Sequence, residues 1–446
     1  MTHYQDALAF LDRHIGLGVK PGLERIGVLL DMLANPHHAY PIIHITGSNG
    51  KTSTARIASS LLAAHGLTVG TFTSPHLEQV EERFSINGAQ ATQEELAEAV
   101  ADVAPFADLL EQRLGERPTY FELTTAIALA WFASHSVDVA AVEVGLGGRL
   151  DATNAADGRV AVVTGISLEH VSYLGDSIAQ IAREKLAIAK PGSVLVAGPM
   201  SEDADREAVD HAASRSIDLR RYGHDFRVAE AERAVGGWLC EVEGIYGVYS
   251  GLYLPLHGRH QTLNLAVAVA AVEELYGRAL STDAAIEGVG AVSSPGRLEV
   301  LGHRPLVVID GAHNEEGFGA LAYSMTEEFP PLGWTVVMGV LGDKDLDAML
   351  AHIDGHVARF YATAPDSDRA RPPGLVASAA RRAFGPDVEV IEMAGVPSAV
   401  IAAKAATPPD GALLVTGSLY VVGEARPVLR GAIAPSSGPG AFRRPS

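Results

Sequence analysis

The chain has 446 residues, of which 47% are hydrophobic and 20% are charged, a balance that is typical of a folded globular protein and excludes a fibrous or disordered chain. Its length suggests roughly two or three domains, and we take two as the working number. The 54 acidic and 34 basic residues give a net charge of −20, which repels nucleic acid and anionic lipid surfaces and disfavours both as partners. A polyanionic ligand would therefore need a local positive site or a metal ion.

The cysteine content and the hydropathy pattern favour a cytoplasmic protein. The single cysteine, Cys240, cannot form an intramolecular disulfide, and no cysteine cluster is present to hold zinc. The first residues lack a basic segment followed by a long apolar run, and no stretch reaches the ~18 apolar residues of a membrane span. We expect a cytoplasmic chain without a membrane partner, and we take it to be a monomer.

In the first part of the chain, short β-branched runs alternate with helical stretches rich in Ala and Leu. This alternation predicts a parallel sheet with helices on both faces. Residues 227–244 and 246–256 alternate with a period of two instead, which predicts a small antiparallel addition within the region 202–256. The predicted strands of the first series are 41–46, 137–145, 159–166 and 193–199.

A second α/β series starts after residue 295. The stretch 291–300 contains Ser, Pro and Gly and follows the helical stretch 263–277, so we place the domain boundary near residue 293. The predicted domains are 1–292 and 293–430, and the Pro-, Gly- and Ser-rich segment 431–446 is expected to be a disordered tail. The predicted strands of the second series are 305–311, 335–340, 359–364, 388–394 and 412–418.

The segment TGSNGKTS at residues 46–53 lies between a predicted strand and a predicted helix that stops at Gly66. A loop in this position turns its backbone N–H groups toward an anion at the helix N-terminus, where the helix dipole favours negative charge. Lys51 adds a point charge and a following hydroxyl reaches magnesium. The alternative is an ordinary Gly- and Ser-rich turn with a stray lysine, and Ile45 stands where the general Walker A pattern has its first glycine. The predicted nucleotide contacts of the loop are Gly47, Ser48, Asn49, Gly50, Lys51, Thr52 and Ser53.

This short loop, together with segments spread over nearly the whole chain, resembles the Mur ligase superfamily and, within it, the folylpolyglutamate synthase and dihydrofolate synthase family. The resemblance implies a Mur-ligase-type ATPase domain with the phosphate loop, followed by a smaller Rossmann-like α/β domain. One such motif would be weak, whereas the whole series in the family's order is specific. The matching segments are 18–36, 72–88, 118–125, 142–154, 173–185, 258–264, 295–299, 310–314, 343–345 and 416–424.

The resemblance implies two magnesium ions and names their ligands. Glu143 ends an apolar strand, and it would bind magnesium together with Ser74 and the loop hydroxyl at Thr52 or Ser53. Hard oxygen donors of this kind suit magnesium. Glu143 has the alternative role of capping the glycine-rich turn that follows it. In the family, a histidine binds the second metal ion, and it corresponds to His170. The alternative for His170 is a purely structural role.

Lys185 matches the lysine that the family carbamylates to help place the second metal. Carbamylation requires a neutral amine, hence a desolvated lysine with a lowered pKa. The alternative is a solvated lysine on a helix surface. Two departures from the family pattern lie nearby, because Glu169 replaces the usual Asp before His170, and Leu186 with Ala187 replaces Ala-Gly.

Five further residues are implied on the nucleotide and reaction side. Arg297 would bring a cation toward the transferring phosphate, which a strongly acidic protein needs. Asp310 and His313 would contact the ribose and line the reaction site, and Gln261 and Asn264 resemble nucleotide-side residues. The residues that we expect to act in catalysis are Lys51, His170, Lys185, Arg297 and His313.

The substrate side is implied by three residues: Lys20 and Phe121 for a folate-type acceptor, and Ser418 for the incoming L-glutamate. The expected reaction is ATP-dependent ligation of glutamate to the acceptor carboxylate through an acyl phosphate. The acceptor is dihydropteroate, tetrahydrofolate or both, and we expect both because the same chemistry serves a carboxylate at either distance from the ring. The alternatives are a Mur-type amide ligase that acts on another carboxylate, and a catalytically weak nucleotide-binding homologue.

Overall fold

The computed structural model describes residues 3–18, 20–329, 333–342 and 344–431. Within this part of the chain, one compact unit holds the residues up to 255 together with 260–293, and a second holds 256–259 together with the residues from 294 onward. Apart from its first residue, the predicted tail 431–446 lies outside the described residues.

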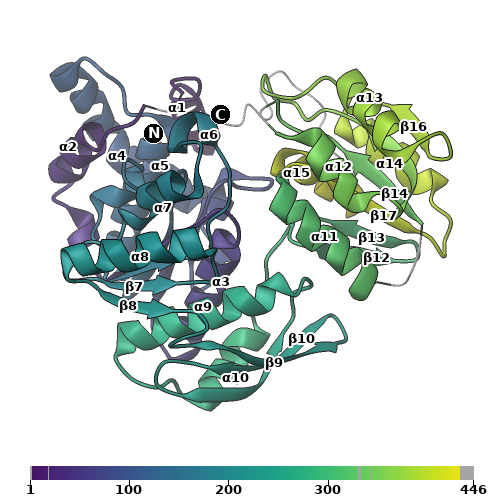
Figure 1. Ribbon diagram of the computed structural model, residues 1–446. Helices are drawn as coiled ribbons and strands as arrows, with labels where there is room; N and C mark the ends of the chain where they lie inside the picture. The colour runs from purple at the N-terminus through teal and green to yellow at the C-terminus, as the bar shows by residue number, and fades with distance from the viewer. Residues whose placement is uncertain (1–2, 19, 330–332, 343, 432–446) are drawn as a thin grey trace. The chain divides into compact units, whose positions relative to one another are not determined.

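The first unit is built on an eight-stranded sheet (Figure 1). The strands β2, β5, β1, β6, β7 and β8 pair in parallel, which confirms the predicted parallel sheet, while β3 and β4 add an antiparallel edge. Because β1 is central, the loop that follows it lies at the carboxyl edge of the sheet, where ligands of open α/β sheets usually bind. The strands are β1 (Ile42–Thr46), β2 (Val69–Phe72), β3 (Phe84–Ile86), β4 (Ala89–Gln90), β5 (Val139–Glu143), β6 (Val160–Val163), β7 (Val194–Ala197) and β8 (Asp218–Arg221).

Several helices of the first unit begin at a residue whose side chain caps the helix N-terminus. At the start of α5, the Thr119 side chain accepts the N–H of Glu122, whose carboxylate accepts the N–H of Thr119 in return. This reciprocal capping box satisfies two amides that the helix itself leaves unpaired. The helices are α1 (Tyr4–Asp12), α2 (Glu24–Met32), α3 (Lys51–Ala64), α4 (Gln93–Leu114), α5 (Tyr120–Ser134), α6 (Val171–Leu174), α7 (Ile178–Leu186), α8 (Glu202–Arg215), α9 (His260–Tyr276) and α10 (Thr282–Gly290), with short 3-10 turns at η1 (Pro36–His38), η2 (Val80–Arg83) and η3 (Ala152–Ala155).

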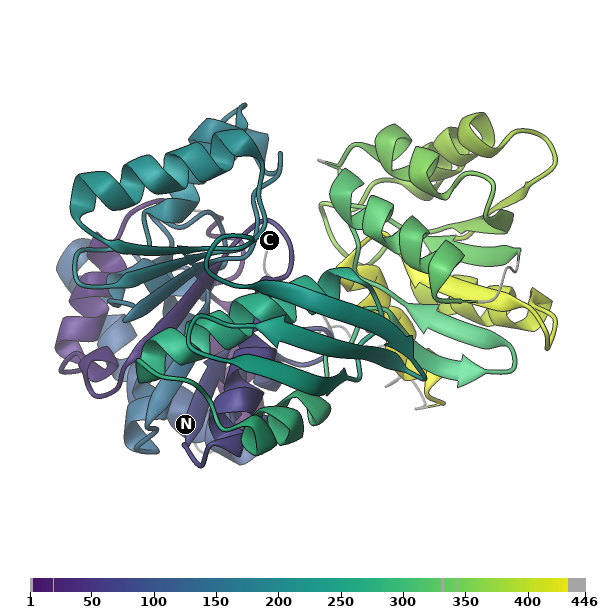
Figure 2. The ribbon, with the colours of Figure 1, turned by 60° about the horizontal axis from the view of Figure 1, so that its bottom comes forward.

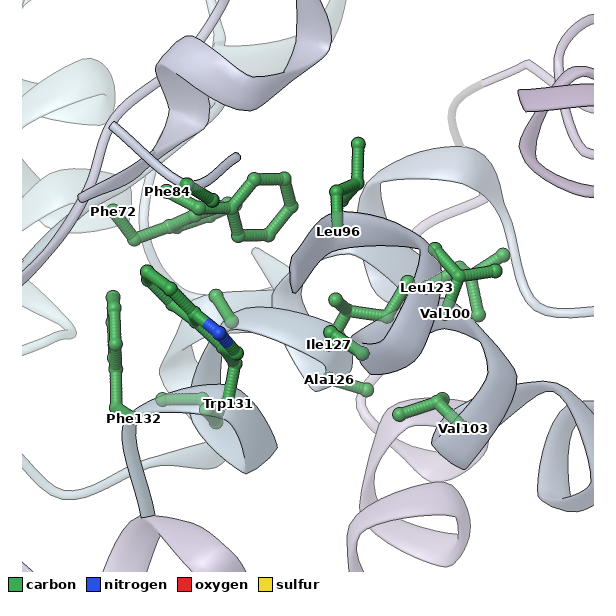
Figure 3. Close-up of a cluster of buried hydrophobic side chains, with 14 of the residues drawn as sticks. Phe72, Phe84, Leu96, Val100, Val103, Leu123, Ala126, Ile127, Trp131 and Phe132 are labelled. Atoms are coloured by element: carbon green, nitrogen blue, oxygen red, sulfur yellow. The ribbon is translucent and has the colours of Figure 1, made fainter. Parts of the chain in front are cut away.

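A large apolar core joins α4 and α5 to the edge of the sheet (Figure 3). The apolar side chains of α4 recur at helical spacing, so one stripe of the helix is buried. Burial of each large apolar side chain contributes about 1.5–3 kcal/mol relative to exposure, so this cluster fixes α5 firmly on the sheet. Its labelled members are Phe72, Phe84, Leu96, Val100, Val103, Leu123, Ala126, Ile127, Trp131 and Phe132.

The region 202–256 begins with a helix and a strand that the sequence did not lead us to predict. The helix α8 buries only small side chains, and β8 has no fully buried residue, so neither has an apolar run. The predicted antiparallel addition is present as the three strands β9 (Arg227–Ala234), β10 (Gly237–Glu243) and β11 (Val248–Leu254). The helices α8 and α9 cover opposite faces of β7 (Figure 1), and α9 also packs against β9 and β10 (Figure 2).

The second unit is a six-stranded sheet in the order β12-β13-β17-β14-β15-β16, parallel except for β12 at one edge. Each predicted strand of the second series overlaps one of these parallel strands, which agrees with the expected Rossmann-like fold. Its strands are β12 (Glu299–His303), β13 (Leu306–Ile309), β14 (Trp334–Met338), β15 (Val357–Ala362), β16 (Glu389–Glu392) and β17 (Ala412–Thr416). Its helices are α11 (Glu315–Glu327), α12 (Leu346–Ile353), α13 (Pro373–Phe384), α14 (Val396–Ala406) and α15 (Leu419–Leu429).

Candidate active site

The loop between β1 and α3 has no room for side chains at its two glycines. Gly47 has φ +151°, and a Cβ built there would overlap the hydroxyl of Thr164. Gly50 has φ +83°, and a Cβ there would overlap the side-chain amide of Asn264. The Thr164 hydroxyl also donates to the carbonyl of Asn49 at 2.5 Å. Both glycines are thus required by the backbone conformation and by the close approach of Thr164, just after β6, and of Asn264 on α9.

Further hydrogen bonds hold this loop to its neighbours. The Ser48 N–H donates to the Gly165 carbonyl at 2.9 Å, and the Ser167 N–H donates to the Ser48 hydroxyl at 2.9 Å. On α9, the side-chain amide of Asn264 donates to Gln261 at 2.9 Å, so these two residues meet beside the loop. Thr164 and Ser167 were not predicted from the sequence; the available signal was a hydroxyl-rich stretch directly after a buried strand.

Two lysines converge on one carbonyl of the loop. Lys51 Nζ donates to the Gly47 carbonyl at 2.8 Å and to the Ser48 carbonyl at 3.1 Å. Lys185 Nζ donates to the same Gly47 carbonyl at 2.9 Å and to Glu169 Oε1 at 2.7 Å. Lys185 is 1% exposed, so the alternative of a solvated helix lysine is wrong.

The pair of Lys185 and Glu169 has strongly shifted pKa values. Burial lowers the pKa of Lys185 to about 8, although the neighbouring carboxylate acts in the opposite direction. Burial by itself would raise the pKa of Glu169, but the charges of Lys185 and Lys51 hold that pKa at about 2. The glutamate that departs from the family pattern is therefore the partner of this lysine, whereas Leu186 points into an apolar cluster and does not take part.

Glu143 gathers oxygen and nitrogen donors at the end of β5. It is 1% exposed, its two carboxylate oxygens accept the Thr52 hydroxyl at 2.9 and 3.0 Å, and Oε2 accepts the Ser74 N–H at 3.1 Å. The glycine-rich turn is capped by another acid, because the Leu146 N–H donates to Asp151. The carboxylate of Glu143 thus faces Thr52 at the end of the phosphate loop, and Ser53, the other candidate hydroxyl, is buried in the first turn of α3.

The donor set around Glu143 fits a magnesium ion. One carboxylate and nearby hydroxyl oxygens are hard ligands, and magnesium usually takes only one or two carboxylates and completes its shell with water and phosphate oxygens. The described part of the chain holds no group of three or more His, Cys, Asp or Glu able to bind a metal. A magnesium site with a single carboxylate does not require such a group, so this finding agrees with the fit. His170 lies at the N-cap of α6 with φ 46°, directly after Glu169.

In the second unit, four predicted residues meet at the carboxyl ends of β13 and β17. Asp310 follows β13 and accepts the N–H groups of Leu298 and Ala312, each at 2.8 Å. A Cβ built at Gly311 would come within 2.9 Å of the Arg297 guanidinium, and His313 Nδ1 lies 2.8 Å from the Gly311 carbonyl. Ser418, two residues after the end of β17, caps α15. Because β13 and β17 are neighbours in the sheet, residues far apart in sequence converge here.

The two acceptor-side candidates lie on different elements of the first unit. Phe121 is in the first turn of α5, and a Cβ built at Gly145 would come within 2.6 Å of its ring. The Phe121 ring also lies 5.9 Å from that of Phe72. Lys20 precedes α2, and its ammonium lies 3.6 Å from Glu116.

Comparisons with known proteins place this geometry in a family. The Mur ligase middle domain family matches residues 45–272, and the Mur ligase, glutamate ligase domain family matches residues 296–419. The dihydrofolate synthase/folylpolyglutamate synthase of Mycobacterium tuberculosis is 39% identical over 92% of this chain and 90% of its own length. The chain belongs to the folylpolyglutamate synthase and dihydrofolate synthase family.

Solved structures of the same family share the fold along almost the entire chain. The structure of Mycobacterium tuberculosis folylpolyglutamate synthase complexed with ADP has a TM-score of 0.91 at 37% identity, covering 96% of this chain and 99% of that one. The structure of E. coli FolC in complex with DHPP and ADP has a TM-score of 0.85 at 28% identity, covering 96% and 98%. As for the membrane, no helix in the described residues is both long and apolar enough to cross one.

Proposed function

We propose that this protein is an ATP-dependent ligase that joins the amino group of L-glutamate to the carboxylate of a folate-type acceptor. The observation that carries the proposal is the convergence of Lys51, Lys185 and the carboxylate of Glu143 on one glycine-requiring loop, in a chain whose relatives carry that activity in their names. The acceptor carboxylate would attack the terminal phosphorus of ATP, so that ADP leaves and an acyl phosphate forms. The glutamate amine would then attack the acyl carbon, and phosphate would leave.

The residues of the first unit would mainly position charge. The backbone N–H groups at the start of α3 and the Lys51 ammonium would hold the polyphosphate, because a helix N-terminus and a point charge both favour anions. Asn264 and Gln261 lie beside Gly50 and would contact the nucleotide on its other side. In the second unit, Arg297 would act on the transferring phosphoryl group, Asp310 on the ribose, and Ser418 on glutamate, with His313 lining the reaction site.

Magnesium is part of the proposal, with Glu143, Thr52 or Ser53, and Ser74 as ligands of the first ion and His170 as a ligand of a second. Bound there, the ions would neutralise the charge of the phosphate oxygens. The fit of the donor set around Glu143 supports the first site.

We also propose carbamylation of Lys185, in which its neutral amine adds CO2 and releases a proton. The lowered pKa of Lys185 favours this step, since it increases the neutral fraction. The bond to Glu169 opposes it. The intact mass of the native protein, with and without added bicarbonate, tests whether one CO2 is present.

For the acceptor, we propose that both dihydropteroate and tetrahydrofolate are used, because the chemistry is the same for a carboxylate at either distance from the ring. The protein would act as a cytoplasmic monomer, and the single cysteine supports a reducing compartment.

The deciding experiment incubates the purified chain with ATP, magnesium and glutamate plus each acceptor, and reads product masses together with ADP release. We expect one glutamyl residue added per ADP. No glutamyl addition to either acceptor would overturn the folate proposal, and addition to a muropeptide acid instead would favour a Mur-type ligase that acts on another carboxylate. ADP release that needs no acceptor would point to a simple nucleotidase.

A further inference from the structure

The segment before α2 and the first turn of α5 are fastened together by one arginine. Arg25, in the first turn of α2, donates through Nη2 to the carbonyl of Lys20 at 2.7 Å. Its Nε donates to Glu122 Oε2 at 3.2 Å, and its Nη2 lies 3.1 Å from Glu122 Oε1. Its third partner is Glu116, which accepts from Nη1 at 3.3 Å.

This contact differs from a surface ion pair because both charged groups are withdrawn from water. The Arg25 side chain is 14% exposed and that of Glu122 is 4% exposed, whereas Glu116 is 52% exposed. Exposed pairs contribute little because water screens them, while a charge left alone in a buried site is costly. The planar guanidinium also fixes direction, since it meets both oxygens of one carboxylate and a carbonyl at once.

The carboxylate that Arg25 grips also builds the start of α5. Glu122 Oε2 accepts the N–H of Thr119 at 2.7 Å, so a single side chain closes the capping box and binds the arginine. Phe121 lies within this turn, and its ring is confined on the other side by Gly145, two residues after Glu143. The position of the Phe121 ring therefore depends on the turn that Arg25 holds.

We propose that Arg25 is a positioning residue for the acceptor. It would set the distance between Lys20 and Phe121, the two proposed acceptor contacts, without touching the phosphate loop. This inference rests on the proposed function, because it assumes that these two residues bind the acceptor. It predicts that the KM for the acceptor depends on Arg25 while the KM for ATP does not, a separation that a general loss of structure would not produce.

The test compares the variants Arg25→Gln and Arg25→Lys with the unaltered chain. Glutamine removes both the positive charge and the planar guanidinium, whereas lysine keeps the charge without the guanidinium. We expect the KM for the acceptor to rise about tenfold in Arg25→Gln and by a smaller factor in Arg25→Lys, with the KM for ATP and that for glutamate within about twofold, because displacement of binding groups mainly weakens the ligand they contact. The matched control is Arg117→Gln, whose partner Glu111 is 40% exposed and 2.8 Å away, and which should change nothing.

The outcomes separate this inference from the function on which it rests. An unaltered chain that ligates glutamate to no folate acceptor refutes the proposed function. An active unaltered chain, combined with an acceptor KM that stays constant in both Arg25 variants or rises in step with the KM for ATP, refutes the role of Arg25 only. If Arg25→Gln unfolds at the assay temperature, Arg25→Lys tests the role of Arg25 instead. The measurement is again the change in the acceptor KM relative to the change in the KM for ATP.

Discussion

Replacing Glu143 by glutamine tests the proposed metal site with almost no change in size. The carboxylate accepts two donors, the Thr52 hydroxyl and the Ser74 N–H. A glutamine oxygen at the position of Oε2 can still accept both donors, but both hydrogen bonds then go to a neutral group instead of a charged one. Because a hydrogen bond to a charged group contributes about 1.5–3 kcal/mol, we expect the free energy of unfolding to fall by about 2 kcal/mol.

The effect of this substitution on turnover should be larger than its effect on folding. Glu143 is the one carboxylate among the proposed ligands of the first magnesium ion, and a lost charge there would weaken transition-state stabilisation by about 4 kcal/mol, which corresponds to roughly a 1,000-fold lower kcat. The assay is ADP release in the presence of acceptor and glutamate, measured over a series of magnesium concentrations, together with a denaturant titration of both proteins.

The control for this experiment is Glu111→Gln, which removes an exposed carboxylate paired with Arg117. It should leave both turnover and stability nearly unchanged, because exposed pairs contribute little. A Glu143→Gln protein that keeps turnover within about threefold of the unaltered chain, with the same magnesium dependence, would refute the metal role that we assign to this residue.

Three further predictions concern the phosphate loop and the pair of Lys185 and Glu169 beside it. Lys51→Ala should retain the fold by circular dichroism but lose at least about 100-fold in kcat, and full activity would exclude its role at the phosphates. Gly47→Ala should lower the free energy of unfolding by about 1–3 kcal/mol, because of its positive φ and the approach of Thr164; an unchanged denaturation midpoint would contradict this. The pKa of Glu169, about 2 in the folded chain against 4.5 for a free glutamate side chain, makes the stabilisation by its pair with Lys185 full above pH 4.5 and lost as the pH falls toward 2. Denaturant titrations across this range should show that loss in the unaltered chain and a smaller one in Glu169→Gln.

Most of the parallel strands were predictable because they carry their own signal, whereas β2, β3, β4 and β12 were not predicted. Residues 160–163 and 412–415 are continuously apolar, as strands buried on both faces must be. The helix α8 was not predicted because it buries only Ala204, Ala208 and Ala212. These small side chains give a weak apolar periodicity among many charged residues. The strand β8 was not predicted because its sequence, DLRR, has no apolar run. It joins the sheet through backbone pairing with β7.

Some residues of the candidate site were likewise predictable from the sequence, and others were not. Gly47 and Lys51 are recognisable from local spacing, because the loop itself determines their conformation. Arg25 and Thr164 acquire their contacts only when distant segments pack together, so no local pattern marks them. Lys185 was ambiguous for a related reason: its own segment resembles a solvated helix end, and only the packing of α7 beneath the loop buries it.

The charge balance around the loop explains how so acidic a protein could hold a polyphosphate. Lys51 and Lys185 both donate to the Gly47 carbonyl, and Glu169 neutralises one of the two. One positive charge thus remains beside the N-terminus of α3, which itself carries roughly half a positive charge from the helix dipole. The carboxylate of Glu143 would cancel this field if it stood alone, which is the electrostatic reason for proposing a divalent cation there. On this reasoning nucleotide affinity should fall steeply when magnesium is chelated, and less so in Glu143→Gln, where the opposing charge is already gone.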